Sequence, residues 1–169
     1  MTDNTLFCWS DAFALGYPQM DATHQEFVAT VNAMFTASDD DLRTALDAFA
    51  EHAQRHFAEE ADWMTSTGFP AAGCHMDEHD AVLKSVAEVQ GLFRDAHPDA
   101  VATARRLARE LANWFPGHAD YLDSALAQWM VKRIHGAVPL VFRRSATSAG
   151  QPAVPDERGH TQPEQLRAE

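Results

Sequence analysis

Apolar residues recur at every third or fourth position through four long stretches of the chain, and each stretch ends at a break rich in glycine, proline or acidic residues. This spacing is the period of an amphipathic α-helix that buries one face, whereas a half-buried β-strand alternates at every second position. No segment shows that alternation. The sequence therefore predicts an all-α protein with helices over roughly residues 22–37, 42–66, 74–95 and 99–134.

Short connections between four such helices favour an antiparallel up-down four-helix bundle. We expect an N-terminal arm at 1–18, the bundle at 19–135 and a C-terminal extension at 136–169. The extension begins with a short apolar segment that can pack back on the bundle. From about residue 143 it is rich in proline, glycine and polar residues, which predicts a mobile, largely disordered tail.

Two positions predict details of these helices. Asp21 has the side chain of a helix N-cap and is expected to begin the first helix. Pro116 and Gly117 lie inside the pattern of the fourth helix, where a proline removes one backbone hydrogen bond and favours a kink.

Charge and composition exclude several classes of partner. The chain of 169 residues carries a net charge of −12, which disfavours nucleic acids and anionic membranes. No apolar run approaches the roughly 20 residues that span a bilayer, and the N-terminus does not resemble a signal peptide. Two cysteines make no disulfide framework, so a reducing, cytoplasmic compartment is expected, with a monomer as the default state.

Histidine is unusually frequent, with nine in the chain, and the helical stripes place several on core-facing positions. Every predicted helix contributes at least one candidate metal ligand on or beside its apolar face. Burying these groups without partners would be unfavourable by several kcal/mol per unpaired charge, on the order of the cost of a buried ion. A metal centre would remove that cost, and the candidate ligands are His24, His56, Glu60, His75, His79, His118 and Asp123.

The number of ligands limits the choice of metal. The zinc-protease pattern H-E-x-x-H fails because Met76 follows His75. Five imidazoles and two carboxylates exceed the four ligands of tetrahedral zinc, and calcium or magnesium prefers an oxygen-rich shell. Two octahedral ions that share both carboxylates and one oxygen bridge would keep a single open position. Imidazole with carboxylate suits iron, and manganese or copper less well.

At these positions the chain resembles the hemerythrin family, and within it the single-domain bacterial hemerythrins, over roughly residues 7–134. The motifs that carry the resemblance are DATHQEF (21–27), HFAEE (56–60), HMDEH (75–79) and HADYLD (118–123). The resemblance implies two non-haem iron ions with an oxo or hydroxo bridge. It implies that one iron is held by His75, His79 and His118, that the other is held by His24 and His56 and keeps the open position, and that Glu60 and Asp123 bridge them.

The function that the resemblance implies is reversible O2 binding without catalysis, as a carrier, store or scavenger of O2. The alternatives are an O2 or redox sensor and a di-iron oxidoreductase that acts on peroxide, nitric oxide or iron. The chain departs from the family at Pro116, Gly117 and Ala119, where larger apolar helical residues are usual. These changes are expected to kink the fourth helix or to open space beside the O2 site.

Several residues near the candidate ligands or on the helix surfaces have positions that the sequence also predicts. His52, four residues before His56, is expected to be a partly exposed helix histidine rather than a neighbour of the metal. Asp77 and Glu78 are expected on the solvent side of their helix, and the pair Arg105–Arg106 on a solvated face. Trp114, one turn before His118, is the candidate for lining an O2 route.

Overall fold

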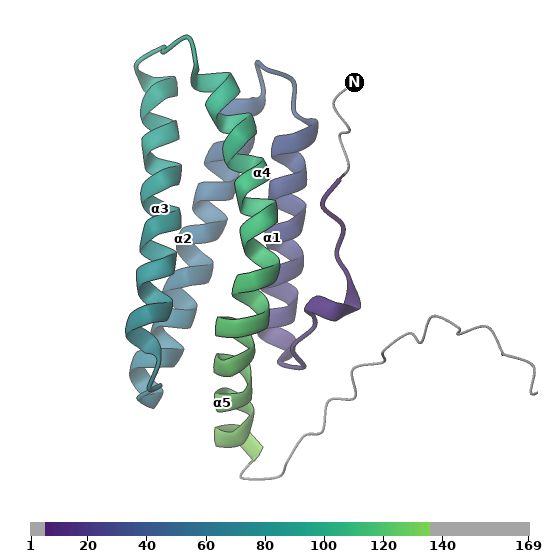
Figure 1. Ribbon diagram of the computed structural model, residues 1–169, viewed down its shortest axis with the longest axis vertical. Coiled ribbons are helices and arrows are strands. Elements are labelled where there is room, and N and C mark those ends of the chain that lie inside the picture. Colours follow the sequence, from purple (N-terminus) through teal and green to yellow (C-terminus); the bar gives the residue numbers. More distant parts are fainter. Residues whose placement is uncertain (1–5, 136–169) are drawn as a thin grey trace, which may run out of the picture.

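The protein forms a four-helix bundle in the computed structural model, which describes residues 6–135 (Figure 1). Within those residues every regular element is helical and no strand occurs. The predicted C-terminal extension at 136–169, with its apolar segment and tail, lies outside the described residues, as do residues 1–5.

The bundle is built from helices that run alternately up and down, so that each packs against its neighbours in the chain and α1 also packs against α4 (Figure 1). The fourth member is a continuous rod made of α4, a π-helical segment and α5. The elements are the 3-10 turn η1 (Asp11–Phe13), α1 (Pro18–Thr36), α2 (Leu42–Thr67), α3 (Ala72–Arg94), α4 (Ala100–His118), the π segment η2 (Ala119–Asp123) and α5 (Ser124–His135).

The first helix begins four residues earlier than the N-cap prediction. Pro18 occupies its first turn, where a proline loses no hydrogen bond because the first N–H groups of a helix have no partner. Asp21 does not act as the N-cap; its carboxylate accepts hydrogen bonds from the backbone N–H groups of Leu15 and Gly16, at 2.6 and 3.1 Å. The prediction for Asp21 was therefore wrong, and the residue instead fixes the turn by which the arm enters α1.

The C-terminal end of α1 is capped by an arginine from α4. The guanidinium of Arg105 donates to the carbonyl oxygens of Met34, Phe35 and Ala37 at 2.7, 3.3 and 2.6 Å, and it pairs with Asp39 at 3.0 Å. The last carbonyls of a helix lack partners within it, so this side chain satisfies groups that would otherwise need water. The prediction of a solvated face holds for Arg106, which is exposed, but not for Arg105.

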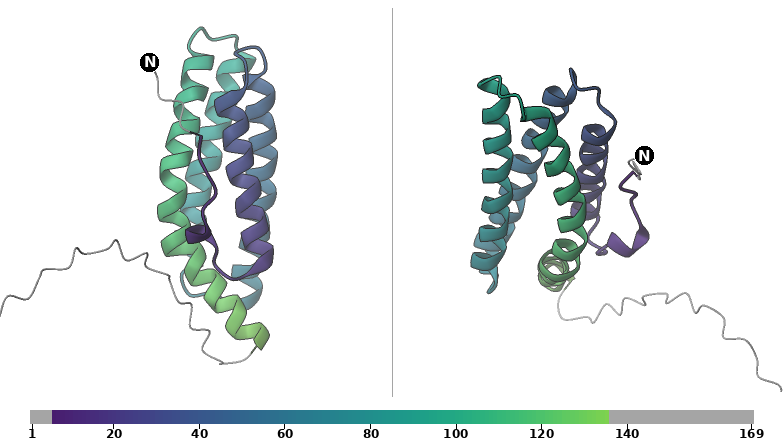
Figure 2. Two further views of the ribbon diagram at one scale, coloured as in Figure 1. Left: turned by 90° about the vertical axis from the view of Figure 1, so that its right-hand side faces the viewer. Right: turned by 45° about the horizontal axis from the view of Figure 1, so that its top comes forward.

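The fourth rod changes its register after Pro116. The helix continues through that proline to His118, and the irregularity comes directly afterwards, in the π segment. One extra residue in this turn moves the buried stripe of the rod forward by one position. Leu126 is therefore buried where the predicted stripe placed Ala125, which is exposed. In the left view of Figure 2, α5 leaves the line of α4 at this point.

Buried apolar residues of α1, α2 and the fourth rod form two clusters, one towards each end of the bundle. A large apolar cluster that includes Phe27, Phe49 and Phe115 fills the end of the bundle near the α1–α2 connection. A smaller cluster around Met20, Met64 and Leu126 fills the other end. The predicted ligands lie between the two clusters, so the candidate site is a polar layer closed by apolar side chains on both sides.

The arm before α1 lies against this bundle. The side-chain amide of Asn32 exchanges hydrogen bonds with the backbone N–H and carbonyl of Phe7, at 2.9 and 2.5 Å. The rings of Phe7 and Phe13 meet Phe115 edge-on, with centroids 5.7 and 5.6 Å apart. Across residues 6–135, no helix has the length and apolar character that a membrane crossing requires.

Candidate metal centre

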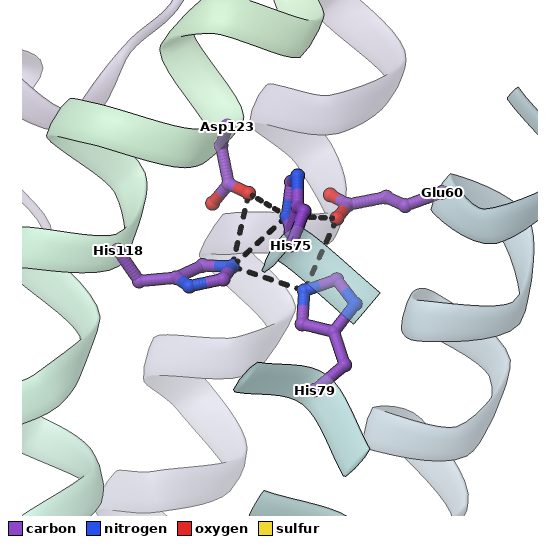
Figure 3. Close-up of side chains that lie close together, drawn as sticks. All are labelled: Glu60, His75, His79, His118 and Asp123. Carbon is purple, nitrogen blue, oxygen red and sulfur yellow. Dashed lines mark hydrogen bonds and ion pairs between the residues drawn. The ribbon is translucent and has the colours of Figure 1, made fainter. Parts of the chain in front are cut away.

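The seven predicted ligand side chains converge in the polar layer as two groups that share Glu60. The first group brings together Glu60, His75, His79, His118 and Asp123 (Figure 3). The second consists of His24, His56 and Glu60. Within each group the candidate ligand atoms lie within 4.8 Å of one another. All seven residues are buried, so the arrangement is an interior cluster and not a solvated acidic surface.

In the first group, ring nitrogens face one another at distances too short for all of them to carry protons. Nε2 of His118 lies 3.2 Å from Nε2 of His75 and 3.0 Å from Nε2 of His79. The three imidazoles come from α3 and from the end of α4, and their Nε2 atoms face one small volume (Figure 3). Imidazoles whose ring nitrogens converge in this way are arranged as metal ligands are.

The two carboxylates each direct one oxygen to each group. Oδ1 of Asp123 lies 3.0 Å from Nε2 of His75, while Oδ2 lies 3.1 Å from Nε2 of His24. Oε1 of Glu60 lies 2.9 Å from Nε2 of His56, and Oε2 lies 3.3 Å from Nε2 of His75. A carboxylate that bridges two metal ions presents its oxygens in this way.

Several buried polar atoms of this cluster are not satisfied by hydrogen bonds within the described residues. Nε2 of His24, Oε2 of Glu60 and both oxygens of Asp123 are buried and make no hydrogen bond of good geometry among the described residues, although the ring nitrogens and these oxygens lie close together. Buried polar atoms are normally paired, because leaving one unpaired is unfavourable by about 1–3 kcal/mol. The donor set therefore fits two metal cations, which would occupy the positions to which these atoms point.

The cluster also perturbs its own protonation. Burial lowers the pKa of His75, but hydrogen bonds to Asp123 and Glu60 outweigh it and raise that pKa to about 9. Burial and the charge of Asp123 raise the pKa of Glu60, but hydrogen bonds from His56 and His75 prevail and lower it to about 2. Burial lowers the pKa of His79 to about 3. Without metal, the cluster therefore balances its carboxylates with protons on some histidines and keeps others neutral.

The π segment is what aligns His118 with Asp123. On a regular α-helix, residues five apart are offset by about 140° and face different directions. Here the N–H of Ser124 donates to the carbonyl of Ala119, five residues earlier, which is the hydrogen bond of a π turn. This wider turn brings Oδ1 of Asp123 to 3.1 Å from Nε2 of His118. The π turn therefore brings the side chains of His118 and Asp123, which are five residues apart, together as neighbouring candidate ligands.

Aromatic rings cover the imidazoles. The ring of Phe57 stacks on His79 with centroids 3.8 Å apart, and Phe115 meets His24 edge-on at 5.1 Å. A groove of about 390 Å³ between α2 and α3 is lined in part by Phe57 and His79. Gly117 is exposed and the space where its Cβ would lie is open, so it does not create room beside the buried site.

Glu78 lies on the solvent side of α3, as the sequence predicts, and it also makes contacts with α4. It is partly exposed, but its Oε2 accepts hydrogen bonds from Nδ1 of His118 at 2.9 Å and from Nε1 of Trp114 at 3.2 Å. The solvent-side interpretation was therefore incomplete. These contacts join α3 to α4, and no spacing within one helix could have revealed them.

The prediction that His52 is a partly exposed helix histidine was wrong. It is buried, its ring lies 5.6 Å from that of His56, and its Nδ1 lies 3.4 Å from Oε2 of Glu26. Burial lowers its pKa to about 4. The sequence did contain a signal, because His52 lies one helical turn before His56 on the same buried stripe.

Comparison with known proteins gives a consistent result. The family model described as hemerythrin HHE cation binding domain matches residues 15–130. A bacteriohemerythrin of Ralstonia nicotianae is 42% identical over 125 residues, which are 74% of this chain and 89% of that protein. A bacteriohemerythrin of Stenotrophomonas maltophilia is 26% identical over 132 residues, which cover 73% of this chain and 86% of the relative.

Proposed function

The chain belongs to the hemerythrin family of cation-binding domains, and on this premise we propose that it binds O2 reversibly at a centre of two non-haem iron ions. The relatives carry the name bacteriohemerythrin, which supports a non-enzymatic, O2-binding role. Two ferrous ions bound there would supply the two electrons that O2 accepts on binding and would regain them when it leaves.

The ligands in this proposal are the seven converging side chains. His75, His79 and His118 would hold one iron, His24 and His56 would hold the other, and Glu60 and Asp123 would each contribute to both positions. The observation that carries the proposal is the placement of the two carboxylates, since each directs one oxygen to each histidine group. The position with only two histidines would leave room for O2.

The choice of iron is supported by the composition of the donor set. Five imidazoles and two carboxylates suit a pair of six-coordinate ions better than tetrahedral zinc. The apolar rings around the site, including those of Phe57 and Phe115, restrict water and slow the proton entry that would release bound O2 as peroxide.

A cytoplasmic, monomeric protein is part of the proposal. Both cysteines, Cys8 and Cys74, are exposed and unpaired, which agrees with a reducing compartment. Gel filtration at micromolar concentration would test the monomer, and an elution volume of a dimer would contradict it.

The proposal is tested by metal analysis and absorption spectroscopy of the anaerobically reduced, iron-loaded chain. We expect two irons per chain and a visible charge-transfer band that appears with O2 and disappears under vacuum. The matched control is the same chain loaded with zinc, which has no redox chemistry and should show no band.

About one zinc per purified chain would contradict the di-iron centre. Turnover of peroxide or nitric oxide without a reversible band would favour the oxidoreductase, and a band coupled to partner binding would favour the sensor.

A further inference from the structure

We propose that Glu78 is a positioning residue of the metal centre, which orients His118 and strengthens it as a metal ligand from outside the ligand set. The inference rests on the proposed centre, in which His118 is a ligand of the three-histidine iron. It concerns a contact between α3 and α4 that the ligand motifs do not contain.

The geometry fixes His118 in two directions. Oε2 of Glu78 accepts a hydrogen bond from Nδ1 of His118 at 2.9 Å. The indole of Trp114 stacks on one face of the same ring, with centroids 4.2 Å apart and an angle of 30°. Nε1 of Trp114 donates to the same carboxylate oxygen at 3.2 Å. Glu78 is therefore held by the residue that also covers the imidazole.

This contact determines which nitrogen of His118 is free for metal. An ionised carboxylate can only accept a hydrogen bond, so Nδ1 must be the nitrogen that carries the proton. Nε2 then presents its lone pair to the cluster, where it lies between His75, His79 and Asp123. A carboxylate behind a ligating histidine fixes the tautomer and makes the imidazole a stronger donor.

The support is specific to His118. In the other four candidate histidine ligands Nδ1 is buried and has no hydrogen-bond partner among residues 6–135; these are His24, His56, His75 and His79. The distinction has a structural reason. His118 directly precedes the π segment and follows Pro116, whereas the other four lie on uninterrupted helices.

The carboxylate is also accessible. The Glu78 side chain is 49% exposed and, with Trp114, lines a groove of about 310 Å³ between α3 and α4. Water therefore screens part of its charge, so we expect an effect at the lower end of the range for such partners, which is about 10- to 100-fold in metal affinity.

Glu78→Gln tests the proposal because glutamine keeps the size and one acceptor oxygen but removes the charge. Asp77→Asn is the matched control, since it removes the same charge from the adjacent, exposed position. The full chain is loaded with Fe²⁺ under argon, and iron release to a chelator is followed. We expect Glu78→Gln to release iron about 10-fold faster than wild type, Trp114→Phe to show a smaller effect, and Asp77→Asn to match wild type. The midpoint potential should rise in Glu78→Gln only, because a negative charge near the iron favours its ferric state.

Thermal unfolding of the metal-free variants separates orientation from a structural role. Under the proposal, Glu78→Gln releases iron faster than Asp77→Asn at a temperature at which both metal-free variants remain folded. Equal iron release and equal potential in these two variants, with a wild-type chain that retains two irons, would overturn the role of Glu78 and leave the proposed function intact. A wild-type chain that retains no iron would overturn both.

Discussion

Asp123 follows His118 by five residues, yet its Oδ1 lies 3.1 Å from Nε2 of His118. A regular α-helix would turn the two side chains about 140° apart. The π segment Ala119–Asp123 removes that offset and places a carboxylate beside the third histidine of the first group. Backbone irregularity is thus localised at the one position where the ligand spacing requires it.

His118→Ala should lower the iron content of the loaded chain below two per chain. The substitution removes a nitrogen that lies within 3.2 Å of both His75 and His79, so the three-histidine position loses one of its ligands. Elemental analysis after desalting measures the iron. The control is His97→Ala, which changes an exposed histidine in the α3–α4 turn. Retention of two irons by His118→Ala would show that the proposed ligand set is wrong.

The metal-free chain should lose stability as pH rises from about 6.5 to about 9. The folded-state pKa of His75 is about 9, above its unfolded value of 6.5, because its hydrogen bonds to Asp123 and Glu60 prevail over burial. Such a group stabilises the fold fully below the unfolded pKa, and its contribution is lost as pH rises through the folded pKa. His118 shifts in the same direction. Urea unfolding at several pH values in this window measures the slope.

His75→Gln supplies the control for this pH dependence, since it removes the group that titrates. Its unfolding free energy should change less between pH 6.5 and 9 than that of wild type. A metal-free wild-type chain that becomes more stable over this window would contradict the protonation of His75. Iron binding should show the opposite trend and strengthen with pH, because the metal displaces the proton.

Arg105→Ala should destabilise the bundle by about 1–3 kcal/mol, the range for losing hydrogen bonds from a charged group. The guanidinium caps three carbonyls at the end of α1, and without it those groups need water. Arg106→Ala removes the same charge from the adjacent exposed position and should change stability by about 0.5 kcal/mol or less. Chemical denaturation of the metal-free variants gives both values. Equal effects in the two variants would mean that α1 does not depend on this cap.

Gly117→Ala should stabilise the chain by about 1 kcal/mol, the difference in helix propensity between the two residues. Gly117 lies in α4, is exposed, and a Cβ there would meet no atom within 4 Å. The iron content and the O2-dependent band should be unchanged, because the residue does not face the site. A weaker or slower O2 response in Gly117→Ala would indicate that this position does affect the pocket.

The pattern of single helices was readable from the sequence. The stripes on α1, α2 and α3 predicted most of the residues that are buried, and the four-residue spacing of His56 with Glu60 and of His75 with His79 predicted neighbouring side chains. These relationships depend on the rise and turn of one helix, which the backbone determines locally. The all-α class and the bundle follow from the same pattern, whereas the family follows from the resemblance of the ligand motifs, and all three are confirmed.

The contacts between helices were decided only by the tertiary structure. Glu78 reaches His118 across 40 residues of sequence, and Arg105 reaches Met34 across 71. The π turn between His118 and Ser124 shifts the stripe of the fourth rod by one residue, which a regular helical period does not anticipate. The physical reason is the same in each case. Spacing along a helix limits which residues share a face, but the partner across the interface depends on how two helices pack and on where their backbones depart from regularity.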